Sequence, residues 1–109
     1  MNKFKYAING LKDALKEKAV ITQCILGIMA IIGGIIIKLD HYEWLAFIIC
    51  IGLVISLEIC NSVIESLCDL YSVEKNEKIR KIKDMAAAAV LVSCIAALVV
   101  CILCLTRRI

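Results

Sequence analysis

Three long apolar segments dominate this chain of 109 residues and restrict the folds that it can adopt. They cover residues 20–39, 44–64 and 85–105. A helix needs ~20 mostly apolar residues to cross the hydrocarbon core of a bilayer, and the third segment carries no charged residue. Hydrophobic residues make up 62% of the chain, above the ~45–50% of a soluble domain. The sequence therefore predicts an all-α membrane protein with three transmembrane helices in a single domain, residues 1–109.

Residues 2–18 have the pattern of an amphipathic helix. Their apolar residues Phe4, Ile8, Leu11 and Leu15 recur at intervals of three or four, and lysines fill the opposite face. A basic amphipathic helix beside a transmembrane segment is expected to lie in the membrane interface. A helix facing a partner in a soluble bundle would show the same pattern, but the adjoining apolar segments favour the membrane.

The basic residues gather on one side of the predicted membrane. Residues 1–19 carry five of them and residues 66–84 another five, out of thirteen in the chain. With three spans these two segments share a side, and the positive-inside rule makes that side cytoplasmic. Because Glu74, Glu77 and Asp84 interleave with the bases of the second segment, a loop at the membrane surface is a better interpretation than a nucleic-acid site. We expect a multi-pass protein of the cell membrane.

Seven cysteines lie in or next to the apolar segments. Cys101 and Cys104 form a CxxC pair, but inside an apolar helix with no other ligand type nearby. Buried cysteine behaves as a small hydrophobic residue. Packing is therefore a better interpretation of these residues than metal or redox chemistry.

A polar stripe interrupts the second apolar segment, whose helix we expect to continue to about Tyr71. Glu58, Asn61, Glu65 and Asp69 stand at positions i, i+3, i+7 and i+11, which share one face of a helix. A carboxylate at the centre of a spanning helix costs ~2.5–3.5 kcal/mol on insertion scales. A polar contact between helices would explain one such acid, but aligned acids repel one another. A divalent cation such as magnesium would relieve the repulsion, so the stripe predicts a functional site without naming a reaction.

The segments "LEICNSVIESLCDL" and "KIKDMAAAAVLV" resemble the prokaryotic diacylglycerol kinase family, which includes the undecaprenol kinases. The family pattern is E-x-x-N-[ST]-x-[IV]-E-x-x-x-D, followed after a short linker by K-D before a span of small residues. The N-terminal "KYAINGL" also looks like the start of the family's sequences, with Tyr6 and Gly10 in matching places. The positions that match the joined pattern are Glu58, Asn61, Ser62, Ile64, Glu65, Asp69, Lys83 and Asp84.

The resemblance implies a fold and an activity. The family fold is an N-terminal surface helix plus three transmembrane helices, assembled as a homotrimer with active sites between protomers at the cytoplasmic membrane edge. The implied reaction is phosphorylation of a lipid hydroxyl by ATP with magnesium, here of diacylglycerol to give phosphatidic acid. Undecaprenol is the alternative acceptor. The expected partners are thus the lipid, ATP, the bilayer and further copies of the chain, but no nucleic acid.

The resemblance also implies roles for single residues. Glu58 would be the general base toward the lipid hydroxyl, and Glu65 would bind magnesium on the ATP phosphates. Lys83 would neutralise phosphate charge, with Asp84 positioning it. The residues expected to bind ATP are Tyr6, Asn61, Asp69, Glu74 and Lys83.

Two departures from the family pattern affect these expectations. Many members have a metal-binding glutamate where this chain has Lys18, so we expect the adjacent Glu17 to serve as the second metal ligand. Many members have histidine where this chain has Asn76, in a segment that contacts the nucleotide. Two other classes stay open: a non-enzymatic small membrane protein, favoured by Lys18, and a proton-coupled transporter, for which the Lys83–Asp84 pair has no evident use.

Overall fold

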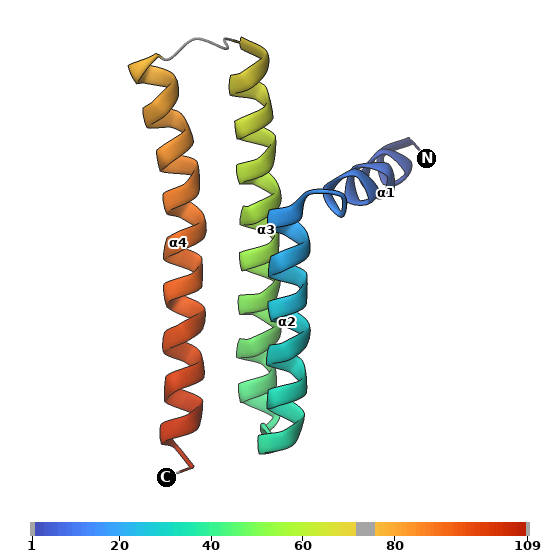
Figure 1. Cartoon of the computed structure of the whole chain (residues 1–109). Helices are drawn as coiled ribbons and strands as arrows, with labels where there is room; N and C mark the ends of the chain where they lie inside the picture. The colour runs from blue at the N-terminus through green and yellow to red at the C-terminus, as the bar shows by residue number, and fades with distance from the viewer. Residues whose placement is uncertain (1, 72–75, 109) are drawn as a thin grey trace.

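The computed structural model describes residues 2–71 and 76–108, and these residues form four helices. The helices are α1 (Asn2–Ala14), α2 (Lys18–Ile37), α3 (His41–Tyr71) and α4 (Glu77–Thr106). Figure 1 shows α2, α3 and α4 side by side in a bundle, whereas α1 projects away from it at the start of α2. The longest helix, α3, packs against both α4 and α2, and its second half extends with α4 beyond the start of α2.

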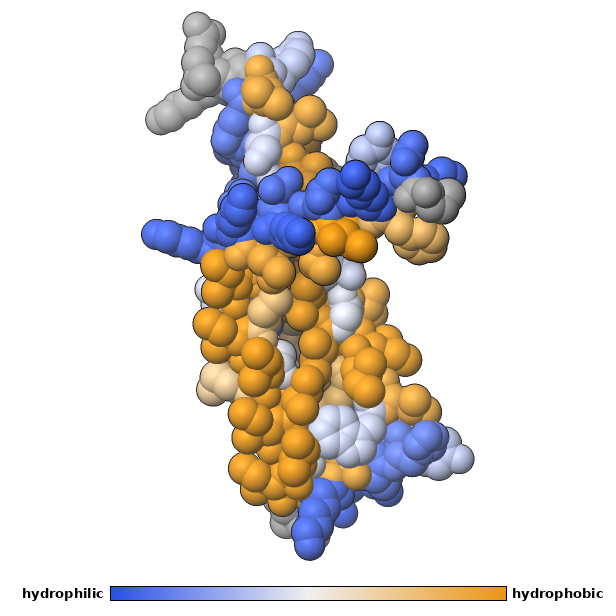
Figure 2. Space-filling view, turned by 90° about the vertical axis from the view of Figure 1, so that its right-hand side faces the viewer, coloured by the Kyte–Doolittle hydropathy of each residue, from blue (hydrophilic) through white to orange (hydrophobic). Residues whose placement is uncertain are grey.

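The three bundle helices are each long and apolar enough to cross a membrane. Many of their large apolar side chains, including those of Ile36, Val92 and Leu98, are exposed on the outside of the bundle. Figure 2 shows this hydrophobic surface lying between two hydrophilic bands. An exposed apolar surface of this extent is unusual for a soluble monomer and suits contact with lipid. The predicted all-α membrane fold with three transmembrane helices is thus confirmed.

Two helix boundaries differ from the intervals expected from the sequence. The first helix ends at Ala14 because the N–H groups of Lys16 and Glu17 bond to carbonyls only three residues back, at Asp13 and Ala14. Glu17 then adopts an extended conformation before α2 begins. At the other end of the chain, α4 starts at Glu77 and includes the charged residues before the third apolar segment.

The early start of α4 has a local cause. The side chain of Asn76 accepts a hydrogen bond of 2.9 Å from the backbone N–H of Lys78, which satisfies one of the free donors at a helix N-terminus. The next residues are Glu77, Lys78, Ile79, Arg80 and Lys81, most of which favour helix. The part of the expected surface loop from Glu77 onward is therefore a helical extension of the third span.

A tight turn joins α2 to α3 at the end of the bundle that we call the turn end. Lys38 has a φ of 58°, and the next N–H, of Leu39, bonds back to the Gly34 carbonyl at 3.1 Å. This is the hydrogen-bond pattern of a left-handed helix cap. A Cβ atom at Gly34 would lie 2.7 Å from Leu39 Cδ1 and 3.0 Å from the Trp44 ring. A side chain at position 34 would therefore displace Leu39, whereas glycine lets the turn pack closely against α2.

An ion cluster closes the turn end. Asp40 and Glu43 cap α3 reciprocally: the Glu43 N–H donates to Asp40 Oδ1 at 2.9 Å, and the Asp40 N–H donates to Glu43 Oε1 at 3.0 Å. The Arg108 guanidinium, from just beyond α4, donates to both Glu43 carboxylate oxygens at 2.6 Å. It also donates to the backbone carbonyls of Ile37 and Lys38. Arg108 thus connects the ends of all three bundle helices.

Candidate active site

The polar stripe predicted from the sequence, Glu58, Asn61, Glu65 and Asp69, lies in the half of α3 away from the turn end. The Asn61 amide nitrogen donates to Glu58 Oε2 at 3.3 Å and to Glu65 Oε1 at 3.2 Å. One amide therefore holds two carboxylates on the same helix face, as the i, i+3, i+7 spacing requires. Glu58 is 6% exposed, whereas Glu65 and Asp69 are exposed.

Gln23 on α2 completes the surroundings of Glu58, and the sequence analysis did not identify it. Its Nε2 atom donates to Glu58 Oε1 at 3.3 Å and lies 4.0 Å from the Cys94 sulfur on α4. A lone glutamine in an apolar span carries no motif, but a polar residue in such a position is itself a signal of a site. Both oxygens of the buried Glu58 carboxylate thus accept hydrogen bonds from neutral amides of different helices.

The stripe lacks a cationic partner for its two inner acids. Among residues 2–71 and 76–108, no lysine or arginine forms an ion pair with Glu58 or Glu65. The Asn61 Oδ1 atom is buried and accepts no hydrogen bond from the residues that the structure describes. A buried acceptor without a partner is costly, and here it adjoins two carboxylates. Oxygen donors of these kinds are the ligands that magnesium prefers, so the residues present fit a hard cation.

The described residues do not by themselves form a complete metal cage. Across the described part of the chain, no three acidic, histidine or cysteine side chains converge on one point. Glu17 instead lines a groove of about 430 Å³ between α1 and α3, whose α3 wall includes Ser62 and Ser66 but not Glu65. Magnesium commonly binds one or two carboxylates together with substrate phosphates, so the arrangement remains compatible with it.

Charged residues at the start of α4 form three ion pairs, one of which reaches the outer end of the stripe on α3. Lys83 Nζ lies 2.7 Å from Asp69 Oδ1, which joins two predicted site residues from different helices. Asp84 pairs instead with Arg80, at 2.7 Å from Nη1, and Arg80 also pairs with Glu77. The sequence analysis missed Arg80. Lys83 is thus positioned by Asp69, while Asp84 pairs with the preceding turn of its own helix.

Two further predicted residues lie apart from this cluster. Tyr6 is exposed on α1, a helix that packs little against the bundle. Glu74 lies outside the described residues. The side chains that the chain itself brings together are therefore Gln23, Glu58, Asn61 and Glu65 in one group, and Asp69 with Lys83 in a second group nearer the end of α3.

Comparison with known proteins identifies the family of this chain. The sequence profile of the family described as prokaryotic diacylglycerol kinase matches residues 5–105. The diacylglycerol kinase of Haemophilus influenzae is 32% identical over 101 residues, which are 91% of this chain and 86% of that protein. The diacylglycerol kinase of Helicobacter pylori is 34% identical over 91 residues, covering 83% of this chain and 71% of that protein. The undecaprenol kinase of Bacillus subtilis is 35% identical over 73 residues, 67% of this chain and 57% of that protein.

The profile match spans nearly the whole chain, including all three apolar helices and both groups of site residues. Relatives with two different acceptor names match at similar identity, so the match identifies the family and leaves the acceptor open. This chain belongs to the prokaryotic diacylglycerol kinase family and is a membrane-embedded lipid kinase.

Proposed function

We propose that the protein transfers the γ-phosphoryl group of ATP to the hydroxyl group of a membrane lipid in a magnesium-dependent reaction. The observation that carries this proposal is the environment of Glu58, a buried carboxylate whose two oxygens accept hydrogen bonds from the Gln23 and Asn61 amides. A carboxylate that is not paired with a cation keeps its capacity to accept a proton from a substrate hydroxyl. Its position in the membrane-spanning half of the stripe suits a hydroxyl carried by a lipid.

The proposed step needs few groups. The lipid hydroxyl oxygen forms a bond to the γ-phosphorus, the bond from that phosphorus to the β–γ bridging oxygen breaks, and ADP leaves. Glu58 accepts the hydroxyl proton, a contribution of typically ~10²–10⁴-fold to such a step. Gln23 and Asn61 orient the two carboxylate oxygens through their hydrogen bonds. The rest of the catalysis is positioning and neutralisation of phosphate charge.

Charge neutralisation is assigned to the outer half of the stripe. We assign magnesium to Glu65, with the unpartnered Asn61 Oδ1 beside it and Glu17 as a second ligand in place of the family's glutamate. The bound ion would stabilise negative charge on the transferring phosphoryl group. Lys83 is assigned to neutralise phosphate charge, and Asp69 lies 2.7 Å from its ammonium group. Asp84, the next residue along α4, is proposed to help position it. Tyr6 and Glu74 are proposed nucleotide contacts.

The proposed setting is a homotrimer with its sites at the cytoplasmic membrane edge, between protomers. The basic residues of α1 and of the start of α4 support a cytoplasmic position, which also gives access to ATP. Tyr6 supports sites shared between protomers, because within a single chain it is exposed on a helix that packs little against the bundle. A neighbouring copy could supply the missing contacts.

Diacylglycerol is the proposed acceptor, with undecaprenol as the second candidate. Relatives of both names match this chain, and the diacylglycerol kinase of Haemophilus influenzae matches over the larger share of both proteins. The test is transfer of labelled phosphate from ATP by the purified protein in mixed micelles, with each lipid separately and with magnesium or a chelator. We expect a labelled lipid only with magnesium and mainly from diacylglycerol. A protein that labels neither lipid would support the non-enzymatic alternative.

A further inference from the structure

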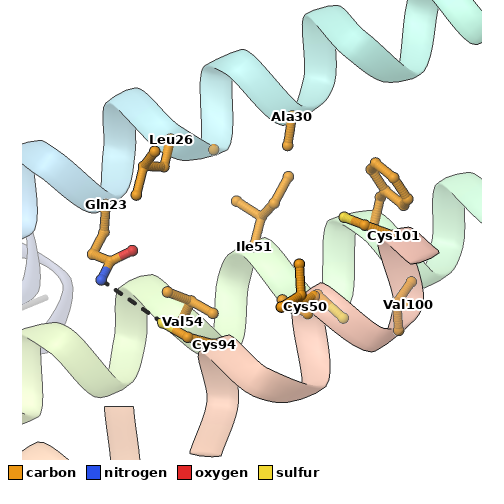
Figure 3. A pocket seen from close by; sticks show the side chains of 13 residues that line it. Gln23, Leu26, Ala30, Cys50, Ile51, Val54, Cys94, Val100 and Cys101 are labelled. Atoms are coloured by element: carbon orange, nitrogen blue, oxygen red, sulfur yellow. Dashed lines mark hydrogen bonds between the residues drawn. The ribbon is translucent and has the colours of Figure 1, made fainter. Parts of the chain in front are cut away.

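An apolar cavity lies between α2, α3 and α4, deeper in the bundle than the stripe. Its volume is about 330 Å³, and Figure 3 shows side chains of all three helices around it, among them Leu26, Ile51 and Cys101. Apart from the Gln23 amide and the cysteine thiols, its lining is hydrocarbon. Water would find few partners in such a space, so the cavity is suited to an apolar occupant.

The cavity is continuous with the candidate active site through one residue. Gln23 lines it and donates the hydrogen bond of 3.3 Å to Glu58 Oε1. Cys94, also in the lining, lies 4.0 Å from the same amide nitrogen, and Figure 3 marks this contact with a dashed line. A molecule that filled the cavity would therefore have its polar end beside the proposed catalytic base.

The dimensions of the cavity fit a single hydrocarbon chain. Its lining runs over residues 23–30 of α2, 47–54 of α3 and 94–101 of α4, which at ~1.5 Å per residue is about 10 Å along the bundle. A methylene group occupies about as much space as a water molecule, ~30 Å³. The cavity volume of about 330 Å³ therefore holds on the order of ten methylene groups, at ~30 Å³ for each group. Two chains side by side would exceed it.

We propose that this cavity binds one apolar chain of the lipid acceptor while the acceptor's hydroxyl lies at Glu58. The inference rests on the proposed kinase function and adds a site that selects the lipid by a single chain. Gln23 lines the cavity and also bonds to Glu58, so a lipid whose chain fills the cavity has its polar end at the proposed base. This favours the acceptor as the occupant over a bulk membrane lipid, because the acceptor's hydroxyl is the group that must reach Glu58. Burial of each methylene group is worth roughly fourfold in affinity, so the site discriminates between chain lengths.

The first test narrows the cavity. Ala97 on α4 lines it, and the adjacent Ala96 is exposed on another face of the same helix. Ala97→Phe should raise the KM for a long-chain diacylglycerol by about tenfold or more, through displacement of at least two methylene groups. The KM for dihexanoylglycerol, whose shorter chains occupy less of the cavity, should rise less than the KM for the long-chain lipid. Ala96→Phe, which adds the same bulk outside the cavity, should change neither lipid's KM.

The second test measures binding without catalysis. Wild-type protein in micelles is irradiated with a diacylglycerol that carries a diazirine in one acyl chain, or with a phosphatidylcholine that carries the same chain. The proposal expects the diacylglycerol probe to label segments 47–54 and 94–101 more than the phosphatidylcholine probe, and Ala97→Phe to reduce this labelling. Equal labelling by both probes would mean that bulk lipid fills the cavity. Failure of both probes to label it would mean that a second copy of the chain covers it. Either result overturns the inference.

The two proposals fail separately. Active enzyme whose chain-length dependence is unchanged in Ala97→Phe would overturn the cavity site and leave the kinase function intact. Selective labelling by the diacylglycerol probe in a protein that transfers no phosphate would keep the lipid site and overturn the proposed reaction.

Discussion

Two glutamates of α3 are buried almost equally but have opposite surroundings. Glu43 at the turn end is 5% exposed and Glu58 in the stripe is 6% exposed. The Glu43 carboxylate accepts two hydrogen bonds of 2.6 Å from the Arg108 guanidinium, and Arg107 Nη1 lies 3.6 Å from its Oε2 atom. Among the described residues, the Glu58 carboxylate accepts side-chain hydrogen bonds from the neutral amides of Gln23 and Asn61 and forms no ion pair. Burial alone therefore does not mark a functional acid, and the partner distinguishes the two.

The pair at the turn end is a structural connection. Its bidentate geometry is the strong form of an arginine–carboxylate contact, and the hydrogen bonds to Glu43 raise the pKa of the Arg108 guanidinium above its usual value. Both groups are thus charged at any physiological pH. Because Arg108 also bonds to carbonyls at the end of α2 and to the Cys104 carbonyl of α4, the pair fixes three helices and leaves no free carboxylate for chemistry.

The largest expected effect is loss of activity in Glu58→Gln. Removal of the proposed base should lower the rate of lipid phosphorylation by ~10²-fold or more. The thermal midpoint of unfolding in detergent should change little, because the variant removes a buried charge but keeps only one of the two acceptor oxygens that the Gln23 and Asn61 amides use. Glu43→Gln is the matched control: it should lower the thermal midpoint while the folded fraction keeps its rate. The comparison of the two acids would be wrong if both variants lost stability but not activity.

Glu65→Gln should also reduce the rate to below about a tenth of wild type, which is a loss of at least ~1.4 kcal/mol of transition-state stabilisation. The cause is loss of a carboxylate that we assign to magnesium, and the fold should stay intact because Glu65 is exposed. Steady-state rates of the purified variant, with its thermal midpoint measured in the same detergent, check both parts. A variant that keeps most of its activity would remove Glu65 from the proposed metal site.

Arg108→Gln should lower the thermal midpoint by several degrees without changing the rate per folded molecule. It leaves the buried Glu43 carboxylate without its main partner, and a buried charge without compensation is strongly destabilising. The double variant Arg108→Gln with Glu43→Gln should be more stable than Arg108→Gln alone, since the orphaned charge is gone. Thermal unfolding of the single and double variants in one detergent tests this. A double variant that is less stable than either single variant would contradict a mutual pairing.

The sequence was sufficient for the fold because each helix has a strong local signal. Three apolar segments and the i, i+3, i+7 spacing of Glu58, Asn61 and Glu65 are properties of single helices, and the structure has them as expected. The boundary at Glu77 was missed because a run of charged residues is typical of both a loop and an exposed helix. Only the cap at Asn76 distinguishes the two.

Contacts between helices were harder to predict. Gln23 is 35 positions from Glu58, and Arg108 is 65 positions from Glu43. Neither pair has a spacing rule, because the packing of α2, α3 and α4 brings them together. The same is true of Lys83, for which the sequence analysis expected positioning by its neighbour Asp84, whereas the structure pairs it with Asp69 across two helices. Local patterns therefore identify the acids of a site, while tertiary packing decides their partners.

The smallest expected effect concerns Glu17, the proposed substitute for the metal ligand replaced by Lys18. A lysine ammonium has no lone pair for a metal, and Glu17 lines the groove between α1 and α3. Because Glu17 lies in an extended conformation between α1 and α2, a change in its backbone dihedral angles would turn its side chain toward Glu65 without disturbing either helix. Glu17→Gln should then raise the magnesium concentration needed for half-maximal rate by a few-fold, whereas Asp13→Asn in the same groove should not. The double variant Glu17→Gln with Glu65→Gln should have nearly the same rate as Glu65→Gln alone, since both acids are proposed to bind one ion. An unchanged magnesium titration in Glu17→Gln would show that Glu65 holds the ion without it.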